Sequence, residues 1–146
     1  MPASRPEPGV LGLRRCAGAR CARAARTRSR LCGPCHDGLA ALLSELPGLY
    51  AAIEHGRAPG TPLPARAVEA RSAVRGVLAS WAHVVVGGRA VPRPVRSVTE
   101  MAGFLYRHVD WLGAHPAVAE IVAELGDLTA RLRHACCAQC AGELAA

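Results

Sequence analysis

Apolar residues recur at three- and four-residue intervals from His36 to Gly56, and this spacing predicts an α-helix. Pro47 lies inside the pattern without changing its phase. Because a proline either kinks a helix or begins a new one, the pattern predicts one bent helix or two short ones. The apolar positions are Leu39, Leu42, Leu43, Leu46, Leu49, Tyr50 and Ile53.

A second helical pattern follows a linker over residues 56–64 that is rich in glycine and proline. This helix is predicted over residues 65–86, and Gly87 with Gly88 is expected to stop it. The side chains expected in its buried face are Val68, Val74, Val77, Leu78, Trp81, Val84 and Val85.

Two further helical patterns occupy the rest of the chain. Ser97 and Glu100 have the spacing of a capping box, so a helix is expected to start there and to run to Leu112. A turn over residues 113–116 leads into a last helix, whose apolar face extends from Val118 to Leu132.

These elements predict a mainly α protein in four parts. Residues 1–15 are expected to form a disordered tail, because prolines and arginines dominate them. Residues 16–35 are expected to form a zinc knuckle, and residues 36–135 an antiparallel bundle of about four helices. Residues 136–146 are expected to be a cysteine-containing C-terminal tail.

Composition narrows the class of protein. The 146 residues suit one small domain, and with 3% aromatic residues its core is expected to consist of Leu, Val and Ala. No run approaches the roughly 20 apolar residues that span a bilayer, and the N-terminus lacks the apolar segment of a secretory signal. The sequence therefore predicts a cytoplasmic protein without membrane association. Thiols stay reduced in that compartment, so clustered cysteines favour metal binding over disulfides.

Four of the seven cysteines lie within one short segment: Cys16, Cys21, Cys32 and Cys35. The spacing, C-x4-C-x10-C-x2-C, consists of two close pairs that can converge on one tetrahedral ion, and zinc is the usual ion for four sulfur ligands. Four thiolates leave no open position for a catalytic water. The predicted role of the zinc is therefore structural.

The second pair, with the sequence Cys-Gly-Pro-Cys, has an alternative interpretation as a redox centre. Such a centre is expected after a β-strand in a βαβ unit, and no strand pattern precedes Cys32. Metal binding is the favoured interpretation, because Cys16 and Cys21 supply the other two ligands.

Cysteines near the C-terminus resemble half of a second metal site. Cys137 and Cys140 have ligand spacing, and His134 and Cys136 are the nearby residues that could complete the site. A partner chain is the other possible source of ligands. Inert thiols are the favoured interpretation.

The positive charge lies at one end of the chain. Residues 1–30 hold eight arginines and one acidic residue, whereas residues 31–146 hold ten of each. The absence of lysine is typical of a GC-rich genome, but that bias does not explain the uneven distribution. The arginines in the cysteine segment are Arg20, Arg23, Arg26, Arg28 and Arg30.

Folding on zinc would fix these arginines in place and direct their charge toward phosphate groups. The segment has no aromatic residue to stack on bases, so the sequence favours weak contact with the backbone of duplex DNA. The alternative function is that of a protein-interaction adaptor, in which the knuckle merely caps the helical bundle.

The other histidines and the acidic residues show no catalytic spacing, so neither enzymatic activity nor a small-molecule substrate is expected.

Several stretches of the helical part and its linkers resemble uncharacterised proteins of actinobacteria and their phages: residues 61–64, 69–82, 108–112 and 114–116. Those proteins have an N-terminal cysteine-rich knuckle before similar helices. The resemblance covers most of the chain. It implies zinc at Cys16, Cys21, Cys32 and Cys35, a phage or prophage regulator as one possible role, and no established activity.

Overall fold

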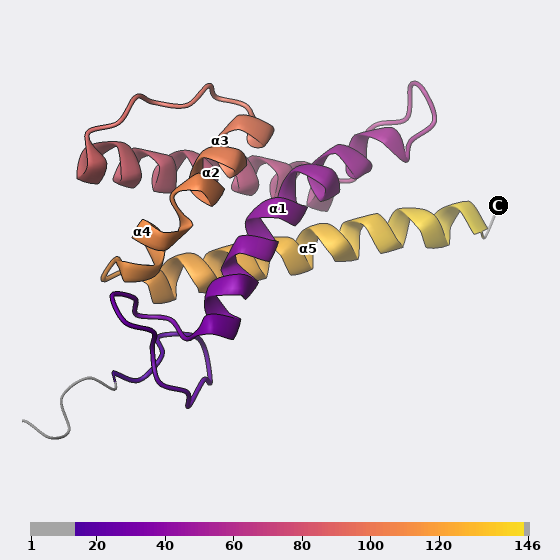
Figure 1. Cartoon of the computed structure of the whole chain (residues 1–146). Helices are drawn as coiled ribbons and strands as arrows, with labels where there is room; N and C mark the ends of the chain where they lie inside the picture. Colours follow the sequence, from indigo (N-terminus) through magenta and orange to yellow (C-terminus); the bar gives the residue numbers. More distant parts are fainter. Residues whose placement is uncertain (1–13, 145–146) are drawn as a thin grey trace, which may run out of the picture.

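The computed structural model describes the chain from Arg14 to Leu144, and its side chains as far as Ala138. The predicted mainly α fold is confirmed (Figure 1), because the described part consists of a cysteine-rich segment followed by helices and contains no β-strand. An isolated β-bridge joins Arg15 to Ala24. The helices are α1 (Gly33–His55), α2 (Ala65–Arg89), α3 (Val98–Arg107), α4 (Val109–Ala114) and α5 (Val118–Leu144).

Two long helices, α2 and α5, run in opposite directions and pack against each other, while α1 crosses them obliquely (Figure 1). The shorter α3 packs against both α1 and α2. Helix α4 follows α3 and connects it to the start of α5. Burial of aliphatic side chains from every helix holds the arrangement together. Those with the least exposure include Leu39, Leu43, Leu46, Ile53, Val74, Leu78, Leu105, Leu112, Ile121, Leu125 and Leu132.

Helix α1 begins three residues earlier than predicted and is a single helix. Cys32 is its N-cap, and Pro34 lies in the first turn, where a missing backbone N–H costs nothing. The helix continues through Pro47 to His55. Burial of Leu43 and Leu46 just before this proline offsets the lost hydrogen bond.

Helix α2 differs from the prediction at both ends. Val68 is 50% exposed, and the buried positions there are Ala67 and Ala70 instead. The helix also passes through Gly88 to Arg89, so the two glycines do not stop it. A Cβ at Gly88 would lie 2.4 Å from Cζ2 of Trp111, so this glycine makes room for the indole ring.

The predicted capping box at Ser97 is confirmed, since Ser97 Oγ accepts a hydrogen bond of 3.1 Å from the Glu100 N–H. The helix predicted as far as Leu112 is divided at His108 into α3 and α4. The imidazole of His108 packs on Phe104, with ring centroids 4.6 Å apart, and the break turns α4 toward the cysteine-rich segment.

The last helix is longer than predicted. The segment expected as a C-terminal tail from residue 136 is helical as far as Leu144. The predicted tail over residues 1–15 lies outside the described residues, except for Arg14 and Arg15. No helix in the described part of the chain is long and apolar enough to cross a membrane.

Candidate metal centre

The four cysteines predicted as ligands converge on one point. The sulfur atoms of Cys16, Cys21, Cys32 and Cys35 all lie within 4.8 Å of one another, and those of Cys21 and Cys32 are 3.7 Å apart. Four sulfurs around a tetrahedral ion at about 2.3 Å are about 3.8 Å from each other, because that separation is the edge of the tetrahedron. The cluster could therefore hold a metal ion.

The first pair of ligands lies on a tight loop. The Cys21 N–H donates to the Gly18 carbonyl at 3.2 Å, and Arg20 adopts a left-handed conformation with φ of 56°. Gly18 is buried against the sulfurs, and a Cβ there would lie 2.6 Å from Sγ of Cys35. A glycine is thus needed at position 18 for the two pairs of cysteines to meet.

The second pair lies where α1 begins. Cys32 is the N-cap and Cys35 lies in the first turn, so the free N–H groups and the helix dipole favour negative charge on the sulfurs. Backbone groups also support the first pair, because the N–H groups of Cys32 and Gly18 donate to Cys16 Sγ at 3.1 and 3.3 Å.

Two of the thiols differ strongly in pKa. Burial opposes ionisation of Cys16, but hydrogen bonds from the Cys32 and Gly18 N–H groups and from the Cys32 and Cys35 thiols outweigh it and lower the Cys16 pKa to about 7. Burial, followed by the neighbouring sulfurs, raises the pKa of Cys35 to about 12. Four thiolates thus repel one another at this distance, and a cation is needed to hold all four in the ionised form.

The cysteine-rich segment begins two residues before the predicted boundary. The Ala25 N–H donates to the Arg14 carbonyl at 2.7 Å, and the Cys16 N–H donates to the Arg23 carbonyl at 2.8 Å. These bonds flank the Arg15–Ala24 bridge and close a small loop around Cys21. We refer to residues 14–35 as the knuckle.

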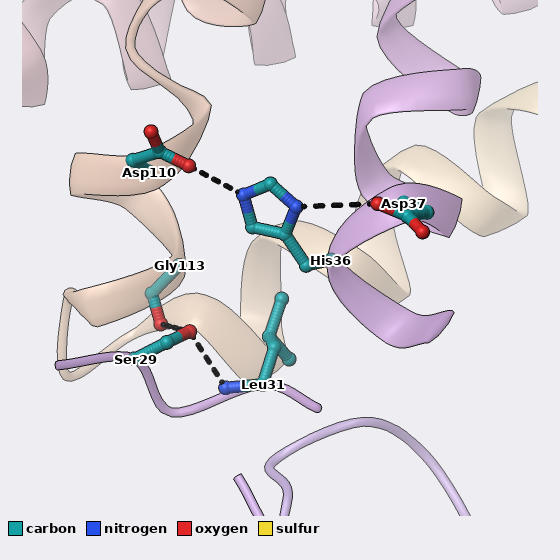
Figure 2. A network of polar contacts seen from close by, with 6 residues as sticks. All are labelled: Ser29, Leu31, His36, Asp37, Asp110 and Gly113. Atoms are coloured by element: carbon teal, nitrogen blue, oxygen red, sulfur yellow. Dashed lines mark hydrogen bonds and ion pairs between the residues drawn. The ribbon is translucent and has the colours of Figure 1, made fainter. Parts of the chain in front are cut away.

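The knuckle is fastened to the helices at the end of α4 (Figure 2). The Gly113 carbonyl accepts a hydrogen bond from Ser29 Oγ at 3.3 Å. It also accepts one from the Arg30 N–H at 2.8 Å. Ser29 Oγ in turn accepts from the Leu31 N–H at 3.1 Å, and Arg30 Nε donates to the Ala114 carbonyl at 3.3 Å. The knuckle therefore supplies donors to carbonyls that α4 leaves free at its C-terminus.

His36, next to the ligand Cys35, links α1 to α4. Its Nε2 lies 2.7 Å from Oδ1 of Asp110, and its Nδ1 lies 3.6 Å from Oδ1 of Asp37 (Figure 2). The side chain of His36 is 13% exposed. This histidine holds the first turn of α1 against α4, which fixes the position of the second cysteine pair.

The arginines predicted to bind nucleic acid differ in their exposure to solvent. Arg20, Arg23, Arg26 and Arg28 are exposed, whereas Arg30 is half-buried and its Nε is bonded to α4. None of them forms an ion pair within the part of the chain that the structure describes.

The residues proposed for a second metal site lie on α5. His134 and Cys137 are exposed, while Cys136 is half-buried with its sulfur 3.8 Å from the Leu49 carbonyl. Consecutive residues of a helix point in directions about 100° apart, so Cys136 and Cys137 face different ways. These three do not form a metal-binding group in the described residues, and the side chain of Cys140 lies outside them.

Sequence reasoning missed the attachment of the knuckle to α4. Ser29 and Gly113 are far apart in the chain, and neither belongs to a recognisable motif. The Ala-His-Pro turn after Gly113 was the available signal, because it predicts where α4 ends and where its carbonyls need donors.

Comparison with protein-family models, curated proteins and solved structures gave no match to this chain. The resemblance to actinobacterial and phage proteins stays a prediction.

Proposed function

We propose that the knuckle binds one structural zinc ion and that its exposed arginines contact the phosphate backbone of duplex DNA. The observation that carries the proposal is the convergence of the sulfurs of Cys16, Cys21, Cys32 and Cys35 within the segment that holds the excess of arginine.

Zinc suits the donor set. Four thiolates favour zinc over magnesium or calcium, which prefer oxygen ligands. The bound ion would neutralise part of the thiolate charge and leave the site with a charge of minus two. Two features of this chain support the ion: the backbone N–H groups that bond Cys16 Sγ and the helix start at Cys32.

The DNA contact rests on the exposure of four arginines that form no ion pair with the described residues: Arg20, Arg23, Arg26 and Arg28. Guanidinium groups bind phosphate oxygens through two parallel hydrogen bonds. Because the zinc would fix the loops that carry them, the arginines would meet DNA in a set arrangement. The expected binding is weak and independent of sequence, since phosphate contacts carry no base information.

Salt dependence tests this proposal. With four arginines engaged, log affinity for a duplex is expected to fall with log salt at a slope of about −4. A variant with Arg20, Arg23, Arg26 and Arg28 replaced by Ala should lose the binding. Replacing Arg75, an exposed arginine of α2, is the matched control and should change little. Unchanged binding by the quadruple variant, or no binding by the zinc-loaded protein at low salt, would contradict the DNA contact.

The second candidate function is a protein-interaction adaptor. The hydrogen bonds from Ser29 and Arg30 to Gly113 and Ala114 favour it, because they join the knuckle to the corner between α4 and α5. If the protein is an adaptor, zinc loading would stabilise the helices, and the zinc-loaded protein would not bind DNA.

A redox role for the Cys32–Cys35 pair is the third interpretation. A redox pair would react with thiol reagents without releasing metal, whereas a zinc site would release one ion as its thiols are modified.

A further inference from the structure

A second group of arginines lies away from the knuckle. Overall, residues 31–146 hold equal numbers of arginines and acidic residues, but the stretch from Arg75 to Thr99 holds four arginines and no acidic residue. Three of the four lie at the end of α2 or in the loop that leads to α3. This loop runs along one edge of the molecule, and the knuckle lies at another (Figure 1). Those three are Arg89, Arg93 and Arg96.

A cavity of about 130 Å³ lies between α2 and this loop. Its volume corresponds to about four water molecules, and it is smaller than the roughly 300 Å³ at which sites for drug-sized ligands begin. The cavity therefore suits a small chemical group. Its polar lining is His83, Arg93 and Arg96, and its apolar lining includes Ala79, Ala82 and Met101.

Within the part of the chain that the structure describes, neither of the two arginines that line the cavity, Arg93 and Arg96, forms an ion pair with a carboxylate. Glu100 is the next acidic residue along the chain, and it lies exposed in the first turn of α3. Two like charges near one small cavity repel each other, and an oxyanion between them would remove that repulsion.

The start of α3 adds to the positive potential beside the loop. The N-terminus of α3 follows directly after Arg96, and its free N–H groups carry partial positive charge.

We propose that the cavity lined by His83, Arg93 and Arg96 binds a phosphate group. The guanidinium groups would hold its oxygens, and the imidazole of His83 can donate a further N–H. The phosphate could belong to a free phosphate, a small phosphate monoester or a nucleic-acid backbone. No residue of this site belongs to the knuckle, so the inference does not depend on the DNA contact proposed above.

Arginine side-chain NMR of the zinc-loaded full chain tests the inference. Inorganic phosphate, and then methyl phosphate, is added to about 10 mM, which would nearly saturate a site with a Kd of about 1 mM. The Nε–Hε signals of Arg93 and Arg96 are expected to shift and to saturate, while that of Arg75 stays in place. Replacing both Arg93 and Arg96 by Ala should raise the Kd at least tenfold, and Arg75→Ala should leave it unchanged.

A second arm identifies the source of the phosphate. A short DNA duplex is added to a variant with Arg20, Arg23, Arg26 and Arg28 replaced by Ala, so that the knuckle no longer binds. Shifts at Arg93 and Arg96 with the free anions support a small-molecule source, and shifts with the duplex alone support a nucleic-acid source. Absence of shifts in both arms, or equal shifts at Arg75, would overturn the inference.

Discussion

The knuckle and the helical part are stabilised in different ways. Before α1 begins, the buried side chains of the described knuckle are those of Leu31, Cys16 and Cys32, and two of these three are candidate ligands. Each of the long helices buries several aliphatic side chains, which are leucine, isoleucine or valine. An apolar core can form without an ion, whereas so short a segment buries too little apolar surface to offset its loss of chain entropy. From this comparison we expect the proposed metal ion to order the knuckle, whereas hydrophobic burial orders the helices.

Removal of the metal should have the largest effect. Structural zinc contributes about 10–16 kcal/mol in small zinc modules at neutral pH, so a strong chelator is expected to disorder residues 14–31. Hydrogen exchange measured by mass spectrometry should show fast exchange at the Ala17 and Arg30 amides, which bond the Arg30 and Gly113 carbonyls in the folded knuckle. The amides of α2 and α5 should stay protected. Equal loss of protection in α2 would show that the two regions depend on one another.

A cavity in the helical core should have the next largest effect. Leu105 of α3 is fully buried, so Leu105→Ala is expected to lower the free energy of unfolding by about 2–5 kcal/mol. Metal content should stay the same, because Leu105 lies in the part that forms without the ion. Urea denaturation and metal analysis measure the two quantities, and Val95→Ala, at a 70% exposed position, is the control. Loss of metal in the Leu105 variant would argue against separate sources of stability.

Two glycine substitutions are expected to act on different quantities, one on metal affinity and the other on helix stability. Gly18→Ala places a Cβ 2.6 Å from Cys35 Sγ, so metal affinity is expected to fall about tenfold or more. Gly76 lies inside α2 with no atom within 4 Å of an added Cβ, so Gly76→Ala should stabilise the helix by up to about 1 kcal/mol. Competition with a chelator and thermal unfolding measure the two effects. Unchanged affinity in the Gly18 variant would mean that the sulfurs have another arrangement.

The smallest expected effect comes from an exposed ion pair between α1 and α5. Arg133 binds both carboxylate oxygens of Glu45, and this hydrogen-bonded pairing lowers the pKa of Glu45. A carboxyl with a lowered pKa stabilises the folded state at neutral pH, and the contribution is lost as the pH falls below its ordinary value of 4.5. Glu45→Gln should therefore slightly lower stability at pH 7 and lose its effect in acid or at high salt. An effect that persists at pH 2 would point to packing instead of charge.

The sequence predicted the features that depend on local spacing. The cluster of four cysteines, the capping box at Ser97 and the existence of the long helices all follow from residues close together in the chain. These features were predictable because coordination, capping and helical periodicity each involve few neighbouring positions.

Features that depend on contacts between distant residues were not predicted. Burial of Ala67 in place of Val68, the space that Gly88 leaves for Trp111, and the bond from Ser29 to Gly113 each depend on tertiary packing. The length of α5 was underestimated because alanine, glycine and cysteine after Leu132 give no apolar periodicity. The arginines of the loop before α3 do not stand out in the sequence, because residues 31–146 hold equal numbers of arginines and acidic residues.

Metal analysis of the purified full chain tests the central claim most directly. Native mass spectrometry should find one zinc ion per chain, and Cys32→Ser should lose it, because Cys32 is both a candidate ligand and the N-cap of α1. Cys137→Ser, at an exposed position on α5, is the matched control and should keep the ion. A chain without metal, or a Cys32→Ser variant that keeps its full zinc content, would contradict the account.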